Sequence, residues 1–311
     1  MNKISVIGAG MTGATTAHWL AERELADIVL VDVVEGMPQG KALDMTEAMP
    51  IIGKDVKIVG ANDYADTKDS DIIIITAGLP RKPGMSRDDL LSANAEIVGT
   101  AATETLKYSP NAIYIVLTNP LDTMAYLTMK KTGLPRNRVI GQAGILDSAR
   151  MRAFVAMETG VSVENIDCYV LGGHGDEMVP LTRHSNVAGI PLKEYLSADK
   201  LDAIVARTRK GGGEIVNLLK TGSAFYAPSA ACAQIAEAIL KNKNLIVPCA
   251  AYMDGEYGLK DIFFGVPVML GRNGIEKVVE YSLDDDEKAM FDKSAAVVKE
   301  THEALKKLVT L

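Results

Sequence analysis

Five short segments that are apolar along their whole length recur in the first 120 residues, and they constrain the fold more than any other feature. They occupy residues 3–8, 27–33, 56–61, 71–78 and 112–120. Helix-like segments separate them, chiefly residues 13–25, 40–49 and 88–109. Strands that are apolar throughout and alternate with helices predict a parallel sheet whose two faces are both covered.

The regular alternation of strand-like and helix-like segments ends at about residue 145. Helical stretches follow, one of them predicted to be interrupted at Gly211–Gly213, and then three segments typical of antiparallel strands and a long terminal helix. We therefore predict an α/β protein with a doubly wound parallel sheet at residues 1–145 and a C-terminal α+β domain at residues 146–311. The 311 residues are enough for two domains in close contact.

The charge and the cysteine content of the chain exclude several classes of binding partner and of site. The net charge of −7 argues against nucleic acid and against an anionic membrane surface, because both attract a basic face. The three cysteines form no CxxC pair, and their odd number argues against a disulfide framework; we assign no metal site. We see no signal peptide and no apolar run near the ~20 residues that span a bilayer, so we expect a soluble cytoplasmic protein.

A glycine-rich turn follows the first predicted strand and opens the first predicted helix. It reads "GAGMTG" and consists of Gly8, Ala9, Gly10, Met11, Thr12 and Gly13. In this context G-x-G-x-x-G is typical of the Rossmann fold, in which the backbone approaches a pyrophosphate and the helix N-terminus faces it. The alternative is a plain glycine turn.

Asp32 ends the second predicted strand, nineteen residues after Gly13. A carboxylate at this place binds the hydroxyls of the adenosine ribose and would repel a 2′-phosphate, so it favours NAD over NADP as the cofactor. The alternative is a strand-end aspartate that caps a turn.

Asn119 stands at the C-terminal end of a central strand, in "VLTNPLD". Ligands of open α/β sheets bind at that edge, and an amide offers both a donor and an acceptor to a nicotinamide or a substrate hydroxyl. An Asn-Pro turn without a ligand is an equally good interpretation of these residues alone.

One of the four histidines has a setting suited to catalysis. His174 lies among glycines in "LGGHGDEMVP", and histidine exchanges protons near neutral pH. A structural histidine in a glycine turn is the alternative. We expect His18 to be packed in the first helix and His302 to be solvated in the charged terminal helix, while His184 has no special setting.

Asp147 and Arg150 are three residues apart in "ILDSARMRAF" and share a face if the segment is helical. Beside a histidine, such a pair makes a substrate site, since the arginine clamps a carboxylate and the aspartate supports an imidazolium. The alternatives are a helix-capping aspartate and a solvated arginine.

Three cations, Arg81, Lys82 and Arg87, follow the fourth predicted strand in "TAGLPRKPGMSR". Such a cluster in an acidic chain suggests an anion site at the strand end. Composition alone favours an exposed basic loop.

Four motifs occur in one order along the chain: "AGLPRKPGMSR", "TNPLD", "LDSAR" and "GGHGDEMVP". Together they resemble the 2-hydroxy-acid dehydrogenase superfamily of lactate and malate dehydrogenases, over essentially the whole chain. The resemblance is to the malate dehydrogenases of the lactate-dehydrogenase-like group. It implies reversible oxidation of (S)-malate by NAD, with His174 as acid/base, Asp147 as its partner and Arg150 as the clamp for the C1 carboxylate.

The resemblance also implies roles for the basic loop and for two strand ends. Arg87 resembles the lid arginine that polarises the substrate carbonyl, and Arg81 the residue that pairs with the second carboxylate, where lactate dehydrogenases usually carry glutamine. It implies further cofactor and substrate contacts at Asn94, Leu117, Thr118 and Asn119. Ser223 and Ala224 depart from the Thr-Ser-Trp stretch of many lactate dehydrogenases, which fits a malate enzyme.

Two rival functions remain open, together with the oligomeric state. A lactate dehydrogenase would leave Arg81 without a second substrate carboxylate. A silent NAD-binding module would give no reason for Asp147, Arg150 and His174 to occur together. The resemblance implies a homo-oligomer, with a tetramer favoured over a dimer.

Overall fold

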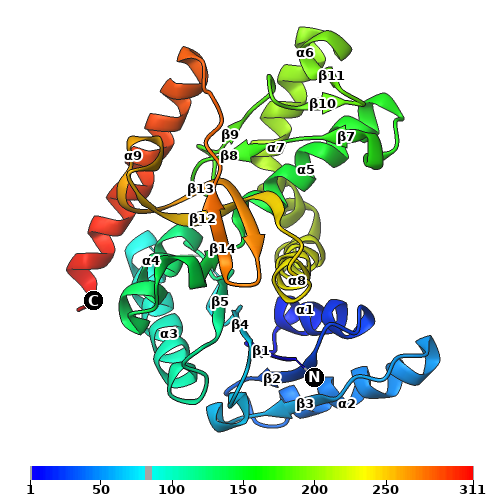
Figure 1. Ribbon diagram of the computed structural model, residues 1–311, viewed down its shortest axis with the longest axis vertical. Helices are drawn as coiled ribbons and strands as arrows, with labels where there is room; N and C mark the ends of the chain where they lie inside the picture. Colours follow the sequence, from blue (N-terminus) through cyan, green and yellow to red (C-terminus); the bar gives the residue numbers. More distant parts are fainter. Residues whose placement is uncertain (1, 81–85, 311) are drawn as a thin grey trace.

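The computed structural model describes residues 2–80 and 86–310 (Figure 1). Strands and helices alternate through the first half, with η denoting a 3-10 helix, in the order β1 (Lys3–Ile7), α1 (Met11–Glu22), β2 (Asp27–Val31), α2 (Met37–Ala48), η1 (Met49–Ile52), β3 (Ile58–Ala61), η2 (Tyr64–Thr67), β4 (Ile72–Ile75), α3 (Arg87–Tyr108), β5 (Ile113–Val116), α4 (Leu121–Thr132), η3 (Arg136–Arg138) and β6 (Val139–Gly141). These six strands pair in parallel in the order β6-β5-β4-β1-β2-β3. The predicted doubly wound sheet is confirmed.

The second half contains α5 (Ala143–Thr159), η4 (Val163–Asn165), β7 (Ile166–Asp167), β8 (Val170–Leu171), β9 (Val179–Pro180), β10 (Asn186–Val187), β11 (Ile190–Pro191), α6 (Leu192–Tyr195), α7 (Ala198–Leu219), α8 (Tyr226–Leu240), β12 (Leu245–Asp254), η5 (Glu256–Gly258), β13 (Lys260–Gly271), β14 (Gly274–Val278) and α9 (Asp285–Leu308). The last three strands are antiparallel, as predicted. They also extend the parallel sheet, because β12 pairs with β6 through Ala250 and Gly141. The sequence patterns did not predict this junction.

The expected helix break at Gly211–Gly213 is wrong, because α7 runs through all three glycines. A Cβ atom at Gly211 would lie 2.3 Å from Cδ of Arg150. This glycine therefore permits close contact between α7 and an arginine of α5, although a mid-helix glycine costs roughly 0.5–1 kcal/mol relative to alanine. The chain turns instead after Leu219, where Gly222 has φ +89°.

Both faces of the parallel sheet are covered by helices. In Figure 1, α3 and α4 lie on one side of β4 and β5, and α1 and α8 lie on the other side of the sheet. The residues of β4 and β5 are all buried. Because parallel strands end at the same edge, this arrangement brings the glycine turn after β1, the segment after β4 and Leu117–Asn119 to one edge of the sheet. No helix among the described residues combines the length and the apolar character needed to cross a bilayer.

Candidate active site

The glycine turn has the geometry of a ligand cradle. Gly8 has φ +103°, which favours glycine, and a Cβ atom at Gly13 would lie 1.7 Å from the carbonyl oxygen of Gly8. A Cβ atom at Gly10 would meet nothing within 4 Å. Gly8 and Gly13 are thus required by packing, whereas Gly10 leaves open space beside the backbone at the start of α1. Ala9 is buried, and Met11 and Thr12 begin the helix.

The carboxylate of Asp32 holds this turn by a hydrogen bond. Its Oδ2 accepts a hydrogen bond from the N–H of Ala9 at 2.6 Å, and its Oδ1 accepts one from the N–H of Val34 at 3.0 Å. A carboxylate has about four lone-pair sites, so it retains acceptor capacity for ribose hydroxyls. Within the described part of the chain, the first turn of α1 carries no acidic residue and no side-chain cap. The turn, the helix start and Asp32 therefore fit the phosphates and ribose of a dinucleotide.

Asn94 connects the ends of β4 and β5. It is 1% exposed, and its Nδ2 donates to the carbonyls of Leu79 at 3.2 Å and Asn119 at 2.7 Å. Its Oδ1 accepts from the N–H of Leu79 at 2.7 Å. Both atoms of the side-chain amide are thus hydrogen-bonded to backbone groups. This favours a role for Asn94 in holding the ends of β4 and β5 over the direct ligand contact that the resemblance implied.

The end of β5 carries the other predicted contacts at this edge. Thr118 donates to the carbonyl of Ala77 at 2.6 Å and is buried, whereas Leu117 is half-buried in the core. The side chain of Asn119 is exposed. Of these three residues, Asn119 is the one most open to a ligand.

A single carboxylate joins the two residues predicted for substrate chemistry. Asp147 is 2% exposed, and its Oδ2 lies 2.8 Å from Nδ1 of His174, while its Oδ1 accepts from Nη1 of Arg150 at 3.0 Å. Because a carboxylate only accepts, Nδ1 of His174 carries the proton and Nε2 is left for proton exchange. Asp147 and Arg150 share a face of α5, as expected.

The surroundings of His174 favour its protonated form. Burial lowers the pKa of His174, but the charge of Asp147, its hydrogen bond and the charge of Asp122 outweigh burial and the opposing charge of Arg150. The pKa of His174 is therefore raised above its usual value. The side chain keeps 19% of its surface exposed, so the imidazole can both hold a proton and reach a ligand.

Three successive N–H groups hold the loop that carries His174. They donate to partners on β13, α9 and α4, namely the carbonyl of Gly265 at 2.8 Å, Oγ of Ser294 at 3.0 Å and Oδ2 of Asp122 at 2.9 Å. Burial raises the pKa of Asp122 to about 6. We did not predict a role for Asp122 or Ser294. The motif "TNPLD" contains Asp122, but nothing local signals the partner 52 residues away.

Arg150 rests against α7. Its Nη1 also lies 3.5 Å from the carbonyl of Thr208, and its side chain fills the space that Gly211 leaves. The guanidinium is thus positioned from two helices, α5 and α7. The sequence analysis did not predict that Thr208 and Gly211 contact Arg150. The run of glycines predicted a break in the helix and not a place where a side chain packs.

The basic loop is only partly described. Arg81 and Lys82 lie outside the described residues. Arg87 is the first residue of α3, where Ser86 and Asp89 form a capping box. The start of this helix is consequently well defined, and it lies in the chain directly after the segment predicted to close over the substrate.

Two expectations about histidines are wrong. His302 is 1% exposed rather than solvated, because α9 packs it against α4 and β13. His18 is exposed rather than packed, because α1 turns it away from the sheet. Within residues 2–80 and 86–310, no group of three His, Cys, Asp or Glu side chains is arranged to hold a metal ion.

Comparison with known proteins decides the family. The model of the lactate/malate dehydrogenase NAD binding domain matches residues 2–141, and the model of the lactate/malate dehydrogenase alpha/beta C-terminal domain matches residues 145–309. The chain belongs to the lactate/malate dehydrogenase family. It is therefore an NAD-dependent oxidoreductase, and the Gly8–Gly13 turn with Asp32 provides residues that fit its cofactor.

Relatives and solved structures agree with this assignment. A malate dehydrogenase of Roseiflexus sp. (strain RS-1) is 59% identical over 304 residues, 98% of each chain. A malate dehydrogenase structure from Cryptosporidium parvum has a TM-score of 0.96 at 47% identity and covers 98% of this chain and 99% of its own. A lactate dehydrogenase from the same organism, complexed with lactic acid and NAD, has a TM-score of 0.95 at 43% identity over 98% of both chains. The family fold thus accommodates both substrates, and side chains must distinguish them.

Proposed function

We propose that this chain catalyses the reversible oxidation of (S)-malate to oxaloacetate. The observation that carries the proposal is the shared carboxylate of Asp147, whose two oxygens contact His174 and Arg150. This arrangement unites a proton-exchanging group with a cation suited to a substrate carboxylate. The malate dehydrogenases that are 58–59% identical over nearly the whole chain support malate over lactate.

His174 is the acid/base in this proposal. Its Nε2 takes the proton of the C2 hydroxyl of malate, and Asp147 stabilises the imidazolium and holds the ring orientation. In the opposite direction, His174 returns this proton to the oxygen formed from the oxaloacetate carbonyl. When bound, NAD accepts the hydride that leaves C2, chemistry that no side chain supplies.

Arginines hold the rest of the substrate. Arg150 clamps the C1 carboxylate, Arg81 pairs with the second carboxylate, and Arg87 stabilises the charge that develops on the C2 oxygen. Asn119 contacts the substrate or the nicotinamide. The loop of Arg81 and Arg87 closes over the substrate and excludes water.

The division of labour follows the two matched family domains. We assign residues 1–145 to cofactor binding and residues 146–311 to substrate binding, a boundary that falls within the first turn of α5. The three cysteines are buried free thiols, which suits a reducing compartment, and we propose the cytoplasm.

We further propose a homo-oligomer, a tetramer in preference to a dimer. Large apolar side chains are exposed on α2 and on η1 directly after it, with Leu43 60% and Ile51 85% exposed. Such clusters commonly mark protein interfaces. Sedimentation equilibrium should give a mass about four times the 33.3 kDa of one chain, and a monomeric mass would refute the proposal.

The decisive test is the absorbance of NADH during reduction of oxaloacetate and of pyruvate. Wild-type protein should prefer oxaloacetate, because pyruvate leaves Arg81 without a partner. Arg81→Gln should lower kcat/KM for oxaloacetate about 10- to 100-fold, since a charged hydrogen bond contributes roughly 1.5–3 kcal/mol, and it should improve pyruvate.

Two neighbouring substitutions are matched controls for this experiment. Arg87→Gln should slow both substrates, because both develop charge at the C2 oxygen, and Lys82→Gln should change little. If Arg81→Gln lowers both substrates equally while Arg87→Gln changes their ratio, the two assigned roles are reversed. If none of the three substitutions changes the kinetics, this loop is not the substrate lid.

A further inference from the structure

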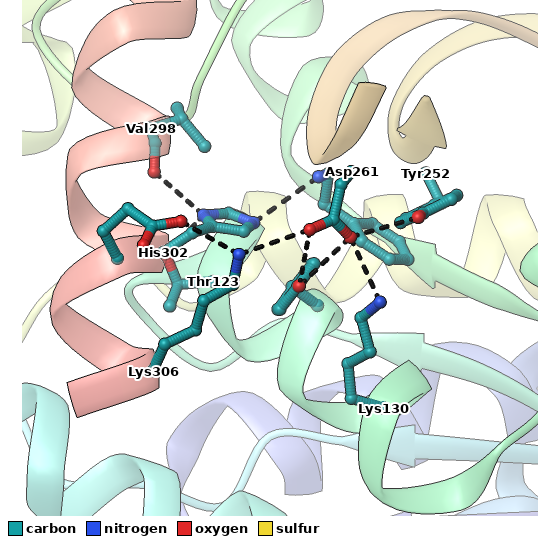
Figure 2. Close-up of polar contacts among 10 residues, drawn as sticks. Thr123, Lys130, Tyr252, Asp261, Val298, His302 and Lys306 are labelled. Carbon is teal, nitrogen blue, oxygen red and sulfur yellow. Dashed lines mark hydrogen bonds and ion pairs between the residues drawn. The ribbon is translucent and has the colours of Figure 1, made fainter. Parts of the chain in front are cut away.

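His302 lies where α9 meets α4 and β13, far from His174 in sequence (Figure 2). Its Nδ1 lies 2.8 Å from the carbonyl oxygen of Val298, and the N–H of Phe263 donates to its Nε2 at 3.4 Å. Because a carbonyl only accepts and a backbone N–H only donates, the ring is neutral and carries its proton on Nδ1. Oγ1 of Thr123 on α4 lies 3.4 Å from the same nitrogen.

The two carboxylates near His302, Asp261 and Glu303, raise its pKa less than burial lowers it, and both are paired with Lys306. Asp261 of this cluster is already bonded by Lys130 at 3.1 Å, by Lys306 at 3.2 Å and by two tyrosine hydroxyls. The titratable groups that face the cluster are Tyr126 and Lys130 from α4, Tyr252 from β12, Asp261 from β13, and Glu303 and Lys306 from α9.

A second ring proton has no acceptable position in this packing. On Nε2 it would point at the N–H of Phe263, break that bond and leave a charge on a side chain that is 1% exposed. Burial accordingly lowers the pKa of His302 to about 4. To accept a proton near pH 5, His302 must leave its site, and the end of α9 must separate from β13 and α4.

The same helix supports the catalytic loop. Oγ of Ser294 accepts the N–H of Gly173, next to His174, and Ser294 lies about two helical turns before His302. Val298 of the same helix lies beside Gly173 as well, because a Cβ atom at Gly173 would come 2.3 Å from its Cγ2. Separation of residues 298–308 therefore reaches the loop that carries His174.

We propose that His302, Thr123, Val298 and Phe263 form an acid-sensitive latch for the C-terminal helix. Protonation of His302 releases residues 298–308 from α4 and β13. The loss of the Val298 side chain from beside Gly173 then weakens the support of the His174 loop, so catalysis falls before the sheet unfolds. The activity part of this inference rests on the proposed function, whereas the release of α9 does not.

Hydrogen–deuterium exchange of the full chain between pH 7.5 and pH 4, corrected for intrinsic exchange rates, tests the latch. Between pH 6 and pH 4.5, peptides from residues 298–308 should lose protection at least tenfold while peptides from β4 stay protected. His302→Gln should keep α9 protected, because an amide can accept from Phe263 and donate to Val298 without titrating. His18→Gln, on the exposed face of α1, is the matched control and should behave as wild type.

Two results would overturn the latch. One is equal loss of protection in α9 and β4 of the wild type, and the other is wild-type acid sensitivity of α9 in a folded His302→Gln protein. If that variant does not fold, the comparison of α9 with β4 in the wild type decides alone. NADH oxidation after return to pH 7.5 should recover fully. If oxaloacetate is not reduced at all, the proposed function fails while the exchange result stands.

Discussion

His174 and His302 carry the same imidazole, yet the structure shifts their pKa values in opposite directions. Burial lowers both values, but at His174 the charges of Asp147 and Asp122 outweigh it, and the pKa is raised. At His302 the hydrogen-bond partners of the ring are a carbonyl and a backbone N–H, and the pKa falls to about 4. The charge and the hydrogen bond of a neighbouring carboxylate, more than the degree of burial, thus decide whether the pKa of a histidine rises or falls.

The two histidines also differ in the part of the structure that holds them. His174 sits on a glycine loop that is held from three elements, and its side chain keeps 19% of its surface exposed. His302 sits on a long helix and is 1% exposed. Substitutions at the two positions should therefore separate chemistry from stability.

The largest expected effect is on turnover. His174→Asn should reduce kcat by roughly 10²–10⁴-fold or more, because the acid/base is lost, and should leave NADH binding nearly intact. Steady-state turnover beside fluorescence titration of NADH measures the two quantities. Retained activity would place the proton chemistry elsewhere, and lost NADH binding would indicate a structural role. His302→Gln should keep kcat within a few-fold of wild type at pH 7.5.

The next effect is on the pH dependence of stability. Below its unfolded pKa of 6.5, His302 binds a proton in the unfolded chain but not in the folded one, so stability falls as the pH falls from 6.5 towards 4. The loss is on the order of 2–3 kcal/mol by pH 4.5. Urea unfolding at several pH values should show a flatter acid limb for His302→Gln, and an unchanged slope would contradict the neutral buried ring.

His174 should contribute to stability with the opposite sign. Its raised folded-state pKa means that its contribution is fully present below pH 6.5 and is lost as the pH rises through the folded value. The loss of stability that wild type shows as the pH rises from 6.5 through the folded pKa of His174 should therefore be absent in His174→Asn, in the same urea experiment. Parallel stability profiles above pH 6.5 for wild type and His174→Asn would show that its carboxylate neighbours do not stabilise the imidazolium.

The smallest effect concerns the arginine that shares Asp147 with His174. Gly211→Ala would place Cβ 2.3 Å from Cδ of Arg150, so the guanidinium must shift, and KM for oxaloacetate should rise about three- to tenfold with KM for NADH unchanged. Gly213→Ala meets nothing within 4 Å and is the matched control in the same helix. It should leave both KM values unchanged and should stabilise the helix by a few tenths to about 1 kcal/mol. If the two variants have the same KM for oxaloacetate, Gly211 does not help to position Arg150.

Local patterns predicted much of this molecule. Strands β1 to β5 and the long helices follow from runs of apolar residues and from helical spacing, which depend on neighbours in the chain. The glycine turn and Asp32 were predicted because a G-x-G-x-x-G sequence has meaning between a strand and a helix. The order of the site motifs along the chain also indicates the family that the two family models match.

The amino-acid sequence by itself determined the alternation of strands and helices, the glycine turn after the first strand and the set of titratable side chains. Tertiary structure decided which histidine is neutral and buried, why α7 continues through three glycines, and how the antiparallel strands join the parallel sheet. The physical reason is distance along the chain. The partners of His302 on β13 and α4 are 39 and 179 residues away, and a pKa depends on the charges and donors that surround a group in space.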